Sequence, residues 1–227
     1  MKIIVPMAGK GSRFIQQGYK TPKPFLDVHG KPMVIRATEM FAEYGDFVFL
    51  VREEHLELAK DLPGDIIVVP EVTEGAACTV GMAAKHMRGE EILIVNSDQI
   101  IRYSPLHFNV LRQQTDVGGI VFVFPCPQGN TKWRYAKIEN SRVVGVAEKQ
   151  AISDWATAGA YYWRNGTDFL HASTRMILRQ LRVNGEFYLC PVYNEFVGQG
   201  KVVPLEVHKV IQLGTPEEYE IYVSNRP

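Results

Sequence analysis

Apolar and polar residues follow two different periods along the first half of the chain. Short continuous apolar runs predict five buried strands, at residues 2–6, 46–52, 65–70, 91–98 and 118–125. Between these runs, the apolar residues recur every three or four positions and predict helices at residues 30–45, 53–62, 75–89 and 105–114. Strands and helices in this alternation are typical of an α/β, Rossmann-like fold, with a mostly parallel sheet and helices on both faces. Such sheets bind ligands at the carboxyl ends of their strands.

The second half of the chain has a more mixed pattern. It predicts a hairpin of strands 133–140 and 142–149, a strand at 157–166, helices at 167–182 and 186–200, a strand at 201–208 and a final helix at 214–223. The sequence has no internal repeat, low-complexity tract or long linker. We therefore expect one domain over residues 1–227, with the α/β half at about 1–125 and a small β-rich lobe within about 126–227.

Composition narrows the class of protein. The 25 basic and 25 acidic residues balance, which argues against a dedicated nucleic-acid binder. Cys78, Cys126 and Cys190 are odd in number and widely spaced, so we expect neither a disulfide scaffold nor a structural zinc site, but a protein of the reducing cytoplasm. The sequence has no apolar stretch near the roughly 20 residues of a membrane span and no signal peptide, so we expect no membrane partner.

The loop after the first strand is the first candidate for chemistry. Its glycines, Gly9 and Gly11, allow close approach to the backbone and are followed by Arg13, and no acidic residue occurs before Asp27. The loop matches neither the dinucleotide fingerprint nor the Walker pattern. The glycines alone are equally compatible with a tight turn and with a phosphate site. Arg13 favours the phosphate site, because a guanidinium offers several hydrogen-bond donors in a fixed, forked arrangement.

A second basic segment follows the opening loop. It contains Lys20, Lys23 and Lys31 among three prolines. Pro22 and Pro24 restrict the backbone on both sides of Lys23, so we expect this ammonium group to have a defined position. The alternative is a solvated lysine on a proline-rich loop.

Several segments together resemble the nucleotidyltransferases that join a nucleoside triphosphate to a sugar phosphate. They are, in chain order, PMAGKGSRF, KTPKPFLDVHGKPM, EGAACTV, NSDQI, AEKQAISDWATAGAYYW, NGEFYLCPVYNE and LGTPEEYE. The order and spacing are more specific than the glycines alone, and the likeness covers nearly the whole chain. The details are most similar to a branch found in bacterial capsule and surface-polysaccharide loci. The resemblance implies the nucleotide-diphospho-sugar transferase fold, with nucleotide bound by the first half and the acceptor phosphate by the second.

The resemblance also implies roles for individual residues. Arg13 would neutralise the departing pyrophosphate, Lys23 would bridge the α-phosphate and the incoming oxygen, and Asp98 would hold Mg²⁺ against the triphosphate. The expected nucleotide-binding residues are Ala8, Gly9, Lys10, Gly11, Ser12, Arg13, Lys23, Gly75, Ala76 and Ser97. The expected acceptor-binding residues are Glu148 for polar groups, Lys149 for the phosphate, Gly159 for close approach to the backbone, and Glu186. A turn cap at Asp98 and an exposed strand end at Glu148 and Lys149 are the purely structural alternatives.

Two positions depart from the family pattern, Gln212 and Pro191, and Pro191 lies where many relatives have an Asp. Gln212 lies where many relatives have a second metal-binding Asp, so Asp98 would hold the metal with phosphate oxygens alone or with a nearby residue such as Glu206. Three other functions stay open: a glycosyltransferase of the related fold, a cytidylyltransferase acting on a non-sugar phosphate such as phosphocholine, and a non-catalytic nucleotide sensor. Asn96-Ser97-Asp98 lacks the Asp-x-Asp pair typical of the glycosyltransferases. The base, the acceptor and any homo-oligomer are not determined by the sequence.

Overall fold

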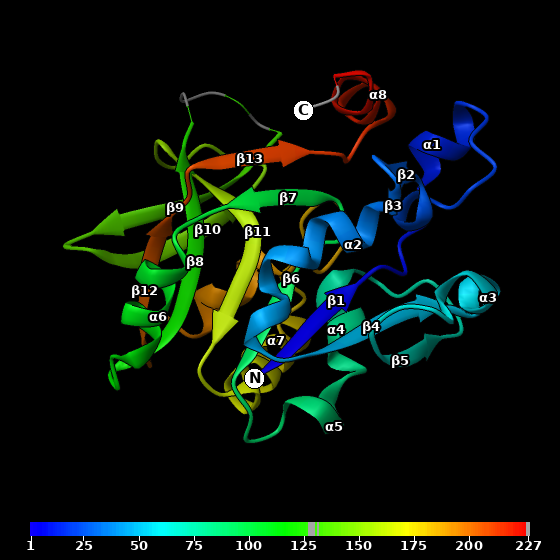
Figure 1. Ribbon diagram of the computed structural model, residues 1–227. Coiled ribbons are helices and arrows are strands. Elements are labelled where there is room, and N and C mark those ends of the chain that lie inside the picture. The colour runs from blue at the N-terminus through cyan, green and yellow to red at the C-terminus, as the bar shows by residue number, and fades with distance from the viewer. Residues whose placement is uncertain (127–129, 131, 226–227) are drawn as a thin grey trace.

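The computed structural model describes residues 1–126, 130 and 132–225 (Figure 1). Within these residues, a nine-stranded mixed sheet forms the centre, in the order β10-β9-β11-β6-β1-β4-β5, with β8 also on β11 and β12 on β8. Its strands are β1 (Lys2–Pro6), β4 (Asp46–Arg52), β5 (Gly64–Val69), β6 (Ile92–Val95), β8 (Val117–Pro125), β9 (Arg134–Glu139), β10 (Arg142–Glu148), β11 (Trp155–Trp163) and β12 (Lys201–Glu206). Two small sheets pair β2 (Asp27–Val28) with β3 (Lys31–Pro32), and β7 (Gln99–Arg102) with β13 (Lys209–Gln212).

The four strands β6, β1, β4 and β5 form the parallel part of the sheet. The apolar runs of β6, β1 and β4 are buried because helices cover both faces, and β6 is buried at every position, whereas in the edge strand β5 only Val69 is buried. The α/β fold and these four strands are therefore confirmed. The fifth predicted strand, β8, lies elsewhere than expected. It is antiparallel to β11, and β11 is inserted between it and β6.

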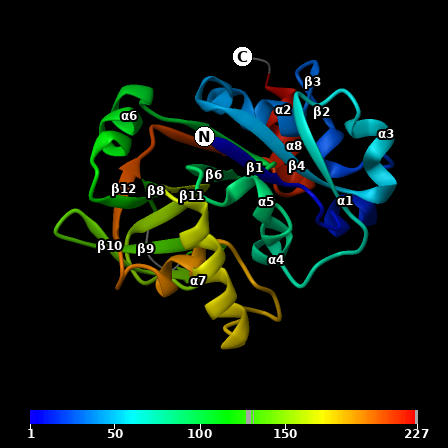
Figure 2. The same ribbon diagram turned by 90° about the horizontal axis from the view of Figure 1, so that it is seen from below.

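Helices lie on both faces of the sheet (Figure 2). The first face packs against α2 and α6 and contains Ile3 and Val5, and the opposite face packs against α4 and α7 and contains Ile4. The α-helices are α1 (Ser12–Gln16), α2 (Met33–Thr38), α3 (Leu56–Ala59), α4 (Ala76–Gly81), α5 (Ala84–Met87), α6 (Pro105–Gln113), α7 (Gly166–Leu178) and α8 (Pro216–Ser224). The 3₁₀ helices are η1 (Lys23–Phe25), η2 (Glu39–Tyr44), η3 (Glu53–His55) and η4 (Cys190–Glu195). None of the helices in the described ranges is long and apolar enough to cross a membrane.

Four predicted helices are shorter than their patterns indicated. Segments 30–45, 53–62 and 75–89 each contain two short helices, and segment 186–200 contains only η4. The last difference has a clear cause at Phe187. Its N–H donates to the carbonyl of Glu74 and its own carbonyl accepts from Ala77 N–H, so the backbone here pairs with the start of α4 and not with its own helix.

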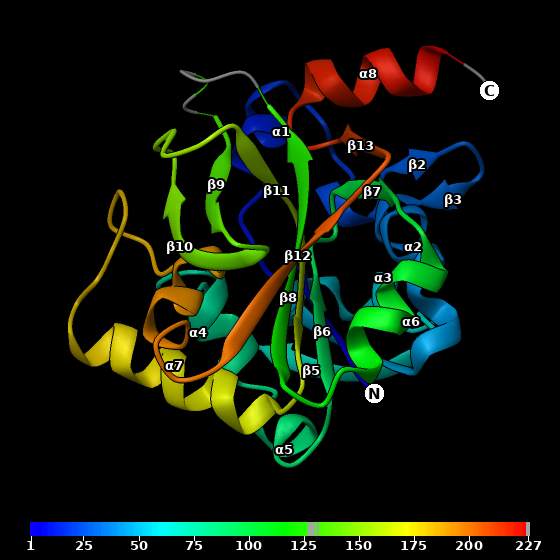
Figure 3. The ribbon, with the colours of Figure 1, turned by 90° about the vertical axis from the view of Figure 1, so that its left-hand side faces the viewer.

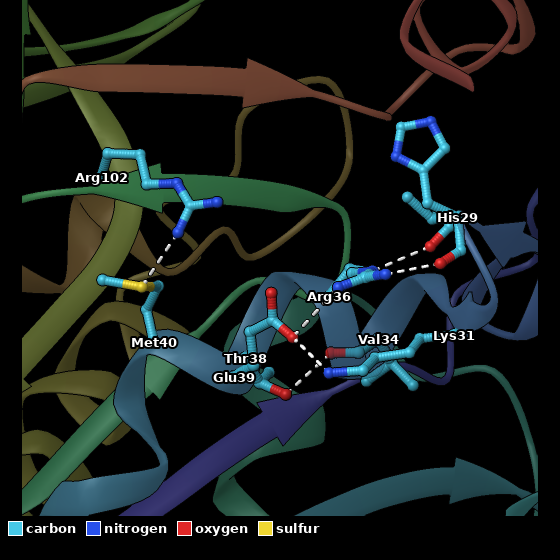
Figure 4. Close-up of polar contacts among 9 residues, drawn as sticks. His29, Lys31, Val34, Arg36, Thr38, Glu39, Met40 and Arg102 are labelled. Carbon is cyan, nitrogen blue, oxygen red and sulfur yellow. Dashed lines mark hydrogen bonds and ion pairs between the residues drawn. The ribbon is translucent and has the colours of Figure 1, made fainter. Parts of the chain in front are cut away.

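The basic segment after the opening loop folds as the small β2–β3 hairpin, which the apolar pattern did not predict. His29 and Gly30 form its turn with φ of 52° and 82°. Arg36 of α2 donates to the carbonyl oxygens of Val28 at 2.9 Å and His29 at 2.5 Å (Figure 4). The same figure shows Glu39 accepting from Lys31 at 2.9 Å. These contacts fix the hairpin on the last turn of α2 and the residue after it.

The β9–β10 hairpin confirms the prediction for the second half of the chain. Asn140 and Ser141 form its turn, with φ of 49° and 58°. Strand β9 pairs with β11 through Ala156 and Tyr135, so the hairpin extends the central sheet at one end (Figure 3). This end of the sheet forms one wall of the cleft described next.

Candidate active site

A cleft of about 760 Å³ lies beyond the carboxyl ends of β1 and β6. Its walls come from the opening loop, the turn before α4, the turn after β6 and the segment after α7. Its lining includes Ala8, Gly9, Lys10, Gly11, Ser12, Lys23, Glu74, Gly75, Ala76, Asn96, Ser97, Asp98, Arg134, Tyr161, Arg182, Glu186 and Tyr188. The structure therefore brings together every predicted nucleotide-binding residue except Arg13.

The opening loop turns sharply at Gly11 before α1 begins. Gly11 has a φ of 64°, in the left-handed region that favours glycine, and a Cβ there would lie 3.5 Å from the Cβ of Lys23. At Gly9 a Cβ would meet nothing within 4 Å, so that face of the loop is open. Lys10 and Ser12 are exposed. The loop thus presents its backbone to the cleft beside Lys23.

Arg13 lies one residue beyond the cleft lining. It is on α1 and its side chain is exposed. Its role at the departing pyrophosphate stays a prediction.

Lys23 and Asp98 form a direct ion pair in the cleft. Their side chains keep only 18% and 25% of their surface exposed, and the lysine Nζ lies 5.8 Å from the ring centre of Phe14. Burial acts to raise the pKa of Asp98, but the Lys23 ammonium, with a smaller effect from Arg134, lowers the pKa overall. Asp98 is therefore an ionised carboxylate, and a cation bound to it would compete directly with Lys23.

Gln212 is held in position by successive hydrogen bonds between side-chain amides. Its Oε1 accepts from Gln99 Nε2 at 2.8 Å, and Gln99 Oε1 accepts from Asn96 Nδ2 at 3.2 Å. The next residue, Leu213, donates its N–H to the Asp98 carbonyl at 2.9 Å, so this segment does lie beside Asp98. The Gln212 oxygen, however, already has a donor within the protein.

The donor set permits a metal that relies on substrate oxygens. In the described part of the chain, no three His, Cys, Asp or Glu side chains gather as a metal site. Mg²⁺ is commonly held by one or two carboxylates together with phosphate oxygens and water. Asp98, ionised and facing the cleft, fits that pattern. Glu206 is exposed at the end of β12 and is not part of the cleft lining.

Arg134 is a cleft residue that the sequence analysis did not identify. Its Nε lies 3.5 Å from Oε2 of Glu148, whose side chain is only 3% exposed. Burial raises the pKa of Glu148, although Arg134 and Lys149 act in the opposite direction. The hairpin register places Arg134 opposite Glu148, so the opposite charges at the open ends of two paired strands were the available signal.

The predicted acceptor residues Lys149 and Glu186 are both linked to Tyr188. Lys149 contacts its side chain, and Glu186 precedes it by two positions in the chain. Lys149 donates to the Tyr188 hydroxyl at 2.8 Å, and its Nζ lies 4.9 Å from the ring centre. Tyr188 and the exposed Glu186 both line the cleft. Lys149 and Glu148 are not part of this lining. Each contacts a residue that is: Lys149 contacts Tyr188, and Glu148 pairs with Arg134.

Gly159 has a different reason to be glycine from the one expected. Its φ is 62°, and a Cβ there would lie 1.8 Å from Gln99 Oε1 and 2.6 Å from Asn96 Nδ2. Two amide side chains thus occupy the space through which a substrate was expected to approach, and Gly159 makes room for them instead. Gly75 does line the cleft, and its φ of 143° and a Cβ distance of 2.4 Å to the Phe187 carbonyl require glycine.

Comparison with known proteins gives a consistent result. A family model described as the MobA-like NTP transferase domain matches residues 3–183. The bifunctional protein GlmU of Methanococcus maripaludis is 29% identical over 108 residues, which are 46% of this chain and 26% of that protein, so the match spans about a quarter of the relative's length.

Solved structures cover the chain more fully. The nucleoside-diphosphate-sugar pyrophosphorylase from Vibrio cholerae RC9 has a TM-score of 0.84 and 29% identity, and the match covers 98% of this chain and 100% of that one. The inositol-1-phosphate CTP transferase from T. maritima has a TM-score of 0.76 and covers 97% and 93%, but at 16% identity it supports the fold alone. On the family match over most of its length, the chain belongs to the MobA-like NTP transferase family of nucleotidyltransferases.

Proposed function

We propose that this protein transfers a nucleotidyl group from a nucleoside triphosphate to a sugar 1-phosphate, or to a similar phosphorylated small molecule. A phosphate oxygen of the acceptor attacks the α-phosphorus, the bond to the β-phosphate oxygen breaks, and pyrophosphate leaves. The observation that carries the proposal is a single cleft in which the opening loop, Lys23 and Asp98 face Arg134, Glu186 and Tyr188. An enzyme of this kind needs two anions held side by side.

The residues of the opening loop would bind the triphosphate. Lys23 would release Asp98 and bridge the α-phosphate and the attacking oxygen, where its charge balances the charge that develops. Arg13 would turn from α1 toward the departing pyrophosphate. Asp98 would hold Mg²⁺, which when bound neutralises phosphate charge and orients the triphosphate.

Two classes of acceptor are candidates. The Vibrio cholerae relative, named for nucleoside-diphosphate sugars, supports a sugar 1-phosphate as the acceptor. A role of the product in polysaccharide synthesis in the cytoplasm, including the capsule role expected from the sequence, is part of the proposal. The T. maritima neighbour acts on inositol 1-phosphate with CTP, which keeps a cytidylyltransferase for a non-sugar phosphate as the second candidate.

Pyrophosphate release from the purified protein tests the proposal. Each of UTP, CTP, GTP and dTTP would be combined with hexose 1-phosphates, a heptose phosphate, inositol 1-phosphate and phosphocholine, with Mg²⁺ or with EDTA. We expect release that requires one NTP, one acceptor and Mg²⁺. The exposed Lys20→Ala variant should match the wild type. No release in any combination would refute the proposal, and glycosyl transfer from an NDP-sugar would favour the glycosyltransferase instead.

A further inference from the structure

The guanidinium of Arg134 is a buried cation in the cleft that no predicted role accounts for. We propose that Arg134 binds the phosphate group of the acceptor and holds it beside the α-phosphate of the nucleotide. This inference rests on the proposed nucleotidyl transfer. It assigns the acceptor's phosphate, the group that contains the attacking oxygen, to a residue outside those expected for that task.

The contacts of Arg134 leave one edge of the guanidinium available. Its Nε faces Oε2 of Glu148 at 3.5 Å. Its Nη1 is buried and, among the described residues, has no hydrogen-bond partner. The side chain as a whole is 25% exposed and lines the cleft, so the buried, unpartnered Nη1 belongs to a side chain that reaches the cleft. A buried donor without an acceptor is costly, and a ligand oxygen would remove that cost.

A phosphate is the ligand that matches this edge. A guanidinium presents parallel N–H groups at the spacing of two phosphate oxygens. Burial acts to lower the pKa of Arg134, but Tyr161 and the carboxylates of Glu148 and Asp98 raise it overall, so the cation is retained. Glu148 forms its ion pair with Nε, so it leaves Nη1 unpartnered.

The position between Glu148 and Asp98 indicates the acceptor and not the nucleotide. Arg134 begins β9 in the second half of the chain, whereas the nucleotide residues belong to loops that follow β1, β5 and β6. Arg134 nevertheless lines the same cleft as Asp98, the carboxylate proposed to hold Mg²⁺. An acceptor phosphate held there would have one oxygen toward the α-phosphorus and its other oxygens on Arg134.

The proposed role involves binding and orientation only. The acceptor oxygen forms the new bond to the α-phosphorus, and the bond from that phosphorus to the β-phosphate oxygen breaks with its electron pair. Arg134 gives up no proton in this step. It lowers the repulsion between two anionic substrates, a cost that a fixed cation can remove before reaction begins.

The test separates the KM of the acceptor from the KM of the nucleotide. We would measure both for the wild type, Arg134→Met, Arg134→Lys and the control Arg142→Met, which changes an exposed arginine of the same hairpin. We expect Arg134→Met to raise the acceptor KM roughly 10- to 100-fold, as for loss of a charge-assisted hydrogen bond, and the NTP KM by less than about threefold. Arg134→Lys should fall between Arg134→Met and the wild type, and Arg142→Met should match the wild type.

Inorganic phosphate supplies a second measurement. We expect it to compete with the acceptor in the wild type and to need at least roughly tenfold higher concentration in Arg134→Met. Should Arg134→Met fail to fold, the folded Arg134→Lys variant still decides, because a lysine loses the paired donors. An unchanged acceptor KM, an effect mainly on the NTP KM, or unchanged phosphate inhibition in an active enzyme overturns the inference alone. A wild type without pyrophosphate release overturns the proposed function, and this inference with it.

Discussion

The two sides of the cleft are built in different ways. The nucleotide side consists of short loops that directly follow parallel strands, and its open glycine backbone lies beside the Lys23–Asp98 ion pair. The acceptor side is assembled from a hairpin and a segment more than thirty residues later, and it contains a buried pair, Arg134 and Glu148.

The two sides have different binding tasks: one binds the triphosphate common to all nucleotides, and the other selects one acceptor. Every nucleoside triphosphate carries the same phosphates, so a backbone loop with one lysine is sufficient to bind them. An acceptor differs from its competitors in shape and polar groups, and a buried charged pair penalises any ligand that does not match it. The predictions below test whether the two sides respond to substitution in these different ways.

The largest effect should come from Lys23→Ala. The ammonium lies at the point where the phosphates would meet, so we expect kcat to fall at least about a hundredfold, or roughly 3 kcal/mol of transition-state stabilisation. The fold should persist, because Lys23 only begins the three-residue helix η1 and its loss frees Asp98 to face water. Single-turnover kinetics with thermal unfolding checks both. Near-normal turnover, with Lys20→Ala as the comparison, would show that the role assigned to Lys23 is wrong.

Gly159→Ala should have the next largest effect, on stability. A methyl group would force Gln99 aside, break the amide chain to Gln212 and hold the residue at a strained φ of 62°. We expect the free energy of unfolding to fall by about 2–3 kcal/mol, measured by urea denaturation. Gly81→Ala is the control, since a Cβ there meets nothing within 4 Å in a helix. Equal stability of the two variants would contradict the packing role given to Gly159.

Gly159 also shows how far the sequence could predict this molecule. Local patterns predicted the four parallel strands and the β9–β10 hairpin, because each depends on residues close together in the chain. Most residues of the nucleotide loops were implied by the family resemblance. The space around Gly159 is filled by Gln99, which is sixty residues earlier, and no local pattern reports such a contact.

The acceptor side was harder to predict for the same physical reason. Arg134 belongs to the cleft only because β9 pairs with β11, a long-range contact. Strand β7 is short and the β2–β3 hairpin has only two residues in each strand, so neither produces a measurable alternation. Segment 186–200 has a helical pattern, yet the backbone of Phe187 pairs with residues more than one hundred positions away.

Glu148→Ala should affect stability to a smaller extent. Removing the carboxylate leaves the Arg134 cation without its nearest counter-charge, which in fully buried pairs costs about 3–5 kcal/mol. Because Arg134 is 25% exposed and water can reach it, we expect a loss of about 2 kcal/mol in urea denaturation. Glu186→Ala, on the exposed side of the same cleft, should change the free energy of unfolding by less than about 0.5 kcal/mol. Equal losses in the two variants would argue against a buried pair.

The isosteric change Glu148→Gln extends this test to the pH dependence of stability. Burial raises the pKa of Glu148 in the folded protein, so the folded state holds this proton more tightly than the unfolded state. The stability contributed by the proton is present below the unfolded pKa and is lost as the pH rises through the folded pKa. The wild type should therefore lose stability relative to Glu148→Gln over that interval. A constant difference between the two proteins would show that Glu148 is solvated.

Tyr219→Phe should have the smallest effect. It tests whether the nucleotide side depends only on residues close together in the chain or also on α8, which is distant in sequence. The Tyr219 hydroxyl on α8 donates to the Asp27 carbonyl at 2.8 Å, and its ring packs edge-on against Phe14. Since the hydrogen bond is exposed, its loss should cost about 0.5–1 kcal/mol in thermal unfolding and change kcat less than about twofold. Tyr222→Phe on the same helix is the control, as its hydroxyl makes no hydrogen bond within the described residues. If both variants are equally stable, α8 supports the start of the chain by ring packing against Phe14 alone; if Tyr219→Phe is the less stable one, α8 also holds β2 through the Asp27 carbonyl.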